Sequence, residues 1–128
     1  MFLSPLLDEP ASRWRLENAR NGQVVAQRVL TAFDSATRRK GLLALESLPE
    51  SSALIIAPTN AIHTCFMQFA IDVAFVRKDG RVLKTCDALR PWRIAAALWA
   101  KAVIELPAGA LSRAETRAGD ELVRVRSL

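Results

Sequence analysis

Short apolar or alternating runs, separated by turn residues, dominate the hydrophobic pattern of the chain. Trp14 and Leu16 alternate with charged neighbours, and Asn21-Gly22 supplies the positive φ angles of a tight hairpin turn. The return strand is predicted over residues 24–30. Further strands are predicted, in chain order, over residues 53–57, 71–76, 82–86, 103–106 and 122–125. Lys78-Asp79-Gly80 predicts a second hairpin between two of them.

Helices should be few and short. Asp34 or Ser35 can cap a short helix that runs toward Leu43, and a second helix over residues 110–117 would end at Gly119. The Ala-rich stretch 94–102 fits either a helical turn or an apolar loop. The pattern therefore predicts a mainly β domain, borderline α+β: a compact antiparallel β-sandwich or barrel with two short helices.

The length of 128 residues suits one domain, with residues 1–11 as a loose leader and 12–128 as the folded unit. The first ten residues make a poor signal peptide, because Pro5 interrupts the apolar run and Asp8 and Glu9 follow it. No run approaches the ~20 apolar residues that a membrane helix needs. We therefore expect a cytoplasmic protein without a membrane partner, either a monomer or a weak dimer.

The formal net charge of +5 comes mostly from arginine and permits binding to phosphates or acidic surfaces. Nucleic acid is not the expected partner, because the chain has only 3 Trp and 5 Phe and no recognisable nucleic-acid-binding module. The two cysteines, Cys65 and Cys86, cannot build a disulfide framework. No glycine-rich phosphate loop occurs, so no cofactor is expected.

Four ordered blocks carry a family resemblance: RRKGLLALESLP, IHTCFMQFAIDVAFVRKDGRVL, LRPWR and IELPAGALSRAETRAGDEL. Over residues 24–125 the chain resembles the family named domain of unknown function 192. The resemblance implies a compact, mostly β fold with short helices and no established activity. The positions that match the family pattern are His63, Thr64, Met67, Asp72, Asp79, Gly80, Arg90, Pro91, Trp92, Glu105, Pro107, Gly109, Gly119 and Asp120.

Two departures from the family pattern concern charge and backbone shape. Ala44 and Leu45 stand where the family usually has a glycine and an arginine. Gln68 replaces a usual cation after Met67, and no proline stands before Asp72. If the missing cation binds an anionic ligand in the family, this chain should bind that ligand weakly or not at all.

Acid–base chemistry is one hypothesis for the central block. His63, the single histidine, could act as a general base with Asp72 orienting its ring. The alternative is that His63 and Thr64 hydrogen-bond to the backbone at a loop edge. For Asp72, a structural role, pinned by backbone N–H groups or by Arg90, is favoured over a catalytic one. Glu105 and Asp120 could join Asp72 as an acidic pair of the glycosidase type.

A soft-metal site is a second hypothesis. On an extended segment His63, Cys65 and Met67 would face one side, and together they would suit Cu(I), with Cys86 as a fourth ligand. The competing interpretation is that methionine and free cysteine fill the core.

The turn at residues 89–93 places Arg90 and Arg93 around Trp92. It could grip a carboxylate, a phosphate or a stacked base, or Trp92 could pack as a lid beneath arginine stems.

The leading interpretation is an uncharacterised small β-domain that binds a small ligand or a protein partner. The surface would be formed by His63, Thr64, Met67, Asp72, Arg90 and Trp92. The alternative is a hydrolase-like enzyme that uses His63 and Asp72 on a small anionic substrate. A structural accessory subunit would instead expose a broad apolar patch, with residues 94–99 as the candidate.

Overall fold

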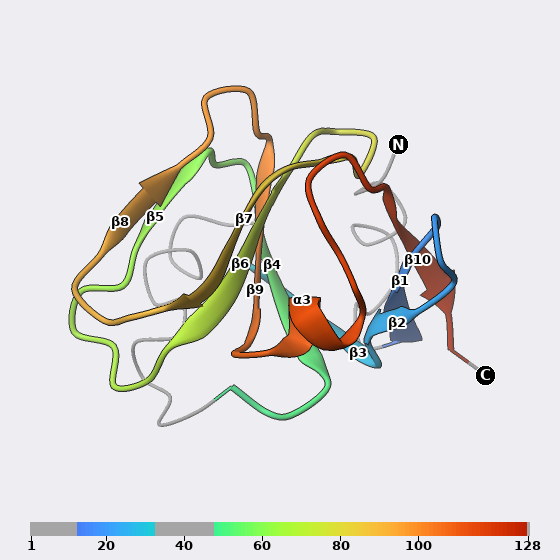
Figure 1. The fold of residues 1–128 in the computed structure, drawn as a ribbon, viewed down its shortest axis with the longest axis horizontal. Coiled ribbons are helices and arrows are strands. Elements are labelled where there is room, and N and C mark those ends of the chain that lie inside the picture. Colours follow the sequence, from blue (N-terminus) through green and yellow to red (C-terminus); the bar gives the residue numbers. More distant parts are fainter. Residues whose placement is uncertain (1–12, 33–47, 128) are drawn as a thin grey trace.

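The computed structural model describes residues 13–32 and 48–127, which form three layers of β-structure (Figure 1). The strands are β1 (Trp14–Asn18), β2 (Val24–Ala26), β3 (Arg28–Ala32), β4 (Ser52–Ile56), β5 (Ala61–His63), β6 (Ile71–Val76), β7 (Val82–Leu89), β8 (Ile94–Ala96), β9 (Ala102–Pro107) and β10 (Leu122–Arg126). The helix α3 (Ala110–Arg113) lies between β9 and β10 in the chain.

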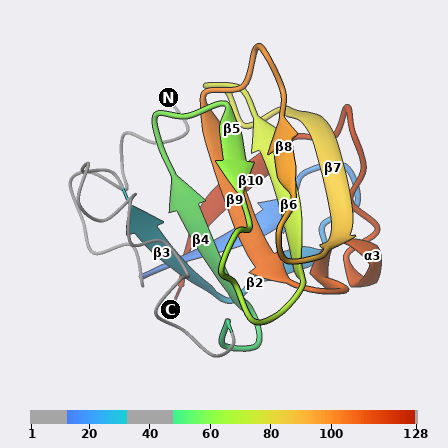
Figure 2. The same cartoon turned by 90° about the vertical axis from the view of Figure 1, so that its left-hand side faces the viewer.

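A five-stranded sheet forms the middle layer, with the strand order β3-β4-β9-β6-β7. Its pairs are antiparallel except β3 and β4, which run parallel. The three-stranded sheet β10-β1-β2 covers one face, and the two-stranded ribbon β5-β8 covers the other (Figures 1 and 2). The described part of the chain is mainly β, as predicted. Its sheets have open strand orders and pack like a sandwich, without a closed barrel.

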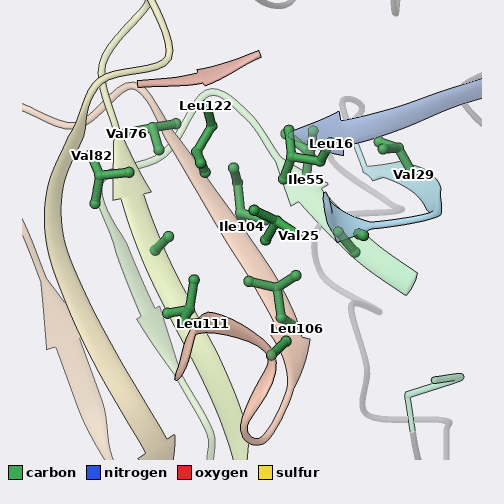
Figure 3. Close-up of a cluster of buried hydrophobic side chains, with 14 of the residues drawn as sticks. Leu16, Val25, Val29, Ile55, Val76, Val82, Ile104, Leu106, Leu111 and Leu122 are labelled. Carbon is green, nitrogen blue, oxygen red and sulfur yellow. The ribbon is translucent and has the colours of Figure 1, made fainter. Parts of the chain in front are cut away.

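The middle sheet is apolar on both faces because it is covered on both sides. On β9, Ile104 and Leu106 join the core against the three-stranded sheet and α3 (Figure 3). Val103, between Ala102 and Ile104 in the strand, joins the core under the ribbon. Every residue of β6 is buried, and its alternate positions divide between the two cores. Ala74, with Asp72 on the same face of the strand, lies in one core and Val73 in the other, as the alternation of a strand requires.

Both predicted hairpin turns form. Gly22 has φ 72° and donates its N–H to the Asn18 carbonyl at 2.8 Å. Gly80 has φ 89° and donates to the Arg77 carbonyl at 3.0 Å. Glycine adopts this left-handed backbone without the steric penalty of a Cβ atom, which is why these dipeptides are reliable turn signals.

The predicted strand 24–30 is wrong as a single element. β2 and β3 belong to different sheets, and the alternation of burial is lost between them, where Val25 and Ala26 are both buried and Gln27 and Arg28 are both exposed. The chain thus passes from one layer to the next at Gln27, whose N–H donates to the Ser51 carbonyl at 2.8 Å.

Four further segments differ from expectation or fall outside the described ranges. The Ala-rich stretch 94–102 contributes β8 and a turn rather than a helix. The second helix is only four residues long, and the chain turns away at Glu115, which has φ 50°. The helix expected after Asp34 and the leader 1–11 lie outside the described residues. Within 13–32 and 48–127, no helix is long and apolar enough to cross a membrane.

The buried carboxylate of Asp120 ties the β1–β2 hairpin to the loop before β10. It accepts hydrogen bonds from Arg20 Nε at 2.7 Å, Asn18 Nδ2 at 2.8 Å and the Arg117 N–H at 3.0 Å. The Arg20 hydrogen bond, helped by those from Asn18 and Arg117, holds the pKa of Asp120 well below its ordinary value of 3.8. These donors join segments about a hundred residues apart in the chain.

We expect Asp120→Asn to lower the free energy of unfolding by about 1–3 kcal/mol at neutral pH, because an amide NH₂ replaces one acceptor oxygen and faces donors from which it cannot accept. Since the folded pKa is depressed, this stabilisation is complete above pH 4 and is lost as the pH falls through the folded value. Urea denaturation between pH 2 and 7 should therefore show a smaller acid-induced loss in the variant. The exposed Asp87→Asn is the control, and equal pH profiles for both variants would contradict the prediction.

Candidate functional site

The carboxylate of Asp72 is fully buried on β6, and backbone N–H groups occupy both of its oxygens. Oδ1 accepts from the Ala88 N–H at 2.8 Å, and Oδ2 accepts from the N–H groups of Gly109 at 3.1 Å and Leu111 at 3.0 Å. The side chain thereby connects β6, the end of β7 and the start of α3. The structural role predicted for Asp72 is confirmed, with backbone groups as its partners in place of Arg90.

A second buried polar residue, Thr64, connects the loop after β5 to the loop before β8. Its hydroxyl donates to the Arg90 carbonyl at 2.6 Å and accepts from the Arg93 N–H at 2.9 Å. Its own carbonyl accepts from the N–H groups of Trp92 at 3.0 Å and Met67 at 3.2 Å. The Thr64 N–H donates to the Arg93 carbonyl at 2.8 Å, which continues the ladder of the ribbon.

The two loops that Thr64 joins each present an aromatic ring to solvent. Phe66 and Trp92 are 69% and 58% exposed, and their ring centroids lie 4.5 Å apart with the planes tilted by 58°. Both residues have left-handed backbones, with φ 69° and 63°. This conformation is strained for bulky side chains, and buried hydrogen bonds to Thr64 hold the Trp92 backbone in place.

Exposed apolar side chains continue along the ribbon from this aromatic pair. Ile94 on β8 is 80% exposed, and Leu98 and Trp99, in the turn that follows, are 74% and 76% exposed. In the register of the ribbon His63 pairs with Ile94, and both are exposed on its outer side, while Ile62 and Ala95 pack toward the core. We call the ribbon face the exposed surface of His63, Phe66, Arg90, Trp92, Arg93, Ile94, Leu98 and Trp99.

Three of the six residues predicted to bind a ligand lie on the ribbon face: His63, Arg90 and Trp92. The other three, Thr64, Met67 and Asp72, are buried and do not reach it. Trp92 is not the buried lid that one interpretation of the turn suggested. Phe66 was not identified from the sequence, because no sequence signal marks a phenylalanine for a left-handed backbone. The stretch 94–99 does contain the apolar patch that was named as a candidate.

The geometry removes the basis of the enzymatic hypothesis. Both oxygens of Asp72 are engaged by backbone groups, whereas the ring of His63 lies on the exposed side of the ribbon. The proposed acidic pair is not formed either. Asp72 and Glu105 point to opposite faces of the middle sheet, and Asp120 is engaged by Arg20.

The metal hypothesis assumed an extended segment, and that premise is wrong. The strand ends at His63, and the left-handed Phe66 breaks the alternation that would align Cys65 and Met67 with it. Met67 is buried in the core beneath the ribbon, and both Cys65 and Cys86 are free thiols. No group of three or more His, Cys, Asp or Glu side chains in the described part of the chain could hold a metal ion.

Among the described residues of the middle sheet, one buried carboxyl group has an oxygen without a hydrogen bond. Glu105 on β9 is 5% exposed and pairs with Leu54 on one side and Val73 on the other, both in the core under the ribbon. Its Oε2 is buried without a hydrogen bond from any described residue. Burial raises the pKa of Glu105 from 4.5 to about 7, because an apolar environment disfavours the charged form.

We expect Asp72→Asn to reduce the free energy of unfolding by about 1–3 kcal/mol, because the amide NH₂ faces backbone N–H donors and cannot accept from them. Chemical denaturation at neutral pH, with the exposed Asp87→Asn as the matched control, measures the difference. A loss of only a few tenths of a kcal/mol would show that the three N–H groups do not need the carboxylate.

We also expect Glu105→Gln to flatten the pH dependence of stability. A raised folded pKa means that wild-type stability falls as the pH rises from 4.5 to about 7, since the folded state holds the proton longer than the unfolded state. Relative to wild type, the variant should therefore gain stability across that interval, on the order of a few kcal/mol. Unfolding free energies at pH 4.5 and 8 test this, with the exposed Glu50→Gln as the control. A pH-independent difference would refute the assignment.

Comparison with known proteins supports the fold and gives no activity. A crystal structure described as a "putative transcription regulator" from Sinorhizobium meliloti 1021 superposes with a TM-score of 0.74 at 22% identity, covering 85% of this chain and 89% of that chain. A protein of unknown function from Novosphingobium aromaticivorans DSM 12444 gives a TM-score of 0.70 at 23% identity, covering 85% and 81%. No curated protein matches the chain.

The family comparison is more direct. The sequence model of DUF192, described as "Uncharacterized ACR", matches residues 16–124, which include all the strands that form the three layers except the outermost residues of β1 and β10. The resemblance seen in the sequence blocks is thus confirmed, and the chain belongs to the DUF192 family, whose function is unknown.

Proposed function

We propose that the protein is a binding module, rather than an enzyme, and that it holds a partner protein on the ribbon face. The observation that carries the proposal is the Phe66–Trp92 pair, two large aromatic side chains exposed on strained backbones. Isolated exposed apolar residues are normal on protein surfaces, but contiguous exposed patches are typical of interaction sites.

The cost of presenting these rings supports a role beyond packing. A left-handed backbone at a bulky residue costs on the order of 1–3 kcal/mol, and such strain concentrates at functional sites. The hydroxyl, the N–H and the carbonyl of Thr64 all form hydrogen bonds that hold the two loops. A pair that is already fixed loses little conformational entropy when a partner binds.

The residue types favour a protein over a small molecule as the partner. Tryptophan and arginine are the side chains that contribute most often to protein–protein binding energy. Trp92 is flanked in the chain by Pro91 and Arg93, with Arg90 one position before, and both arginines are exposed. The exposed apolar surface also extends past the pair to Ile94, farther than a compact ligand would need.

Phage-displayed random peptides, selected on the immobilised protein, provide the test. We expect the selected pool to bind Trp92→Ala at least about tenfold more weakly than wild type, as a truncated central anchor should. Leu30→Ser is the matched control, because Leu30 is an exposed apolar residue on β3, away from the ribbon. It should leave binding unchanged.

Two results would contradict the proposal. One is a selected pool that binds wild type and Trp92→Ala equally, or no enrichment at all. The other is a thermal-shift screen of metabolites that yields a stabilising compound whose effect disappears in Arg90→Ala, because this would indicate a small anionic ligand. Thermal unfolding of each variant confirms that the exposed substitutions leave the fold intact.

A further inference from the structure

We infer that the partner of the ribbon face is an acidic polypeptide segment that contacts two separate anchors, one at each end of the ribbon. This inference rests on the proposed function and adds to it the chemistry and length of the partner. The first anchor is the Phe66–Trp92 pair, and the second is the turn that carries Leu98 and Trp99.

Hydrogen bonds also hold the second anchor to the ribbon. The Ala100 N–H donates to the Ala97 carbonyl at 3.0 Å, which closes a turn with Leu98 and Trp99 at its corners. Asn60 fixes this turn to the start of β5, because its carbonyl accepts from the Ala97 N–H at 2.9 Å and its amide donates to the Leu98 carbonyl at 3.3 Å. The two exposed side chains therefore project from a defined position.

The spacing of the anchors sets the length of the partner. Leu98 lies six positions after Trp92, with β8 between them, so the two anchors lie at most about 20 Å apart at ~3.3 Å per residue. Ile94, on the outer side of β8, provides apolar surface along the way. An extended segment of about six residues could reach from one anchor to the other.

Charge determines which segment fits. Residues 58–70 and 84–101, which include the ribbon, its adjoining loops and most of β7, contain four Lys or Arg residues and one acidic residue, so they carry +3 of the formal +5. The cations are Lys84, Arg90, Arg93 and Lys101, and the acidic residue is Asp87. Five of the seven exposed large apolar side chains of the described ranges lie on the same segments. Apolar anchors among cations complement a chain that carries both apolar and acidic side chains.

The same observations disfavour other occupants. A second copy of this chain would bring two surfaces of like charge together. Single-stranded nucleic acid would stack on the aromatic rings, but Ile94 and Leu98 have no ring face to offer a base.

The test uses the peptides obtained from display on the full chain. We expect them to be enriched in Asp and Glu and to contain two bulky apolar residues several positions apart. Trp92→Ala and Trp99→Ala should each weaken peptide binding about tenfold, as should the double variant Arg90→Gln/Arg93→Gln at low salt. Leu30→Ser should have no effect.

The three indole N–H resonances provide an independent readout. In ¹⁵N-labelled protein the signals of Trp92 and Trp99 should shift on peptide addition, while that of Trp14, half-buried beside the core on the far side of the middle sheet, should not. Loss of binding in Trp92→Ala with full binding in Trp99→Ala would overturn the two-anchor inference and leave the proposed function standing. Indifference to both substitutions would overturn both.

Two further probes test the other classes of partner. Vesicles of equal parts phosphatidylcholine and phosphatidylglycerol, and a single-stranded oligothymidylate, are titrated against wild type and Trp99→Ala. Binding of either probe that is tighter than that of the peptides and is lost in Trp99→Ala would overturn the inference. Selected peptides rich in Lys and Arg would overturn it as well.

Discussion

The burial of one carboxylate constrains much of this fold. Asp72 lies on β6 with no exposed surface, so its carboxylate oxygens need hydrogen-bond donors inside the protein. Three backbone N–H groups provide them. Two of the donors begin α3, and the third belongs to Ala88, which has φ 49° near the end of β7. The path of the chain into the loop that carries Trp92 is thereby set from within the sheet.

The ribbon depends in the same way on the hydrogen bonds of Asp72 and of Thr64. A buried hydroxyl and its neighbouring backbone groups hold two loops whose aromatic residues have strained, left-handed backbones. The polar residues that match the family pattern thus divide into two kinds. Thr64 and Asp72 shape the backbone from inside, whereas Trp92 and Arg90 are exposed on the shape that results.

Local signals in the sequence were sufficient for the mainly β class, the two glycine turns and the strand at residues 71–76, because each depends on neighbouring residues. The passage from β2 to β3 at Gln27 was missed, since it depends on which sheet each half joins. The same holds for the site: Asp72 and Trp92 stood out as residue types, but Phe66 could be recognised only once its contact with Trp92 was known. These features depend on contacts between residues far apart in the sequence, and the hydrophobic periodicity does not reveal such contacts.

At the ribbon, the exposed side chains are distinct from the groups that hold the backbone, and this has an evolutionary consequence. The side chains of Phe66, Ile94, Leu98 and Trp99 take no part in the hydrogen bonds that hold their backbones, which run through Thr64, Asn60 and the β5–β8 ladder. Substitution at these positions changes the chemistry of the exposed surface and leaves the supporting hydrogen bonds in place. Descendants of one ancestral chain can therefore present different surfaces on an unchanged scaffold, and sequence comparison of the buried residues alone would not distinguish them.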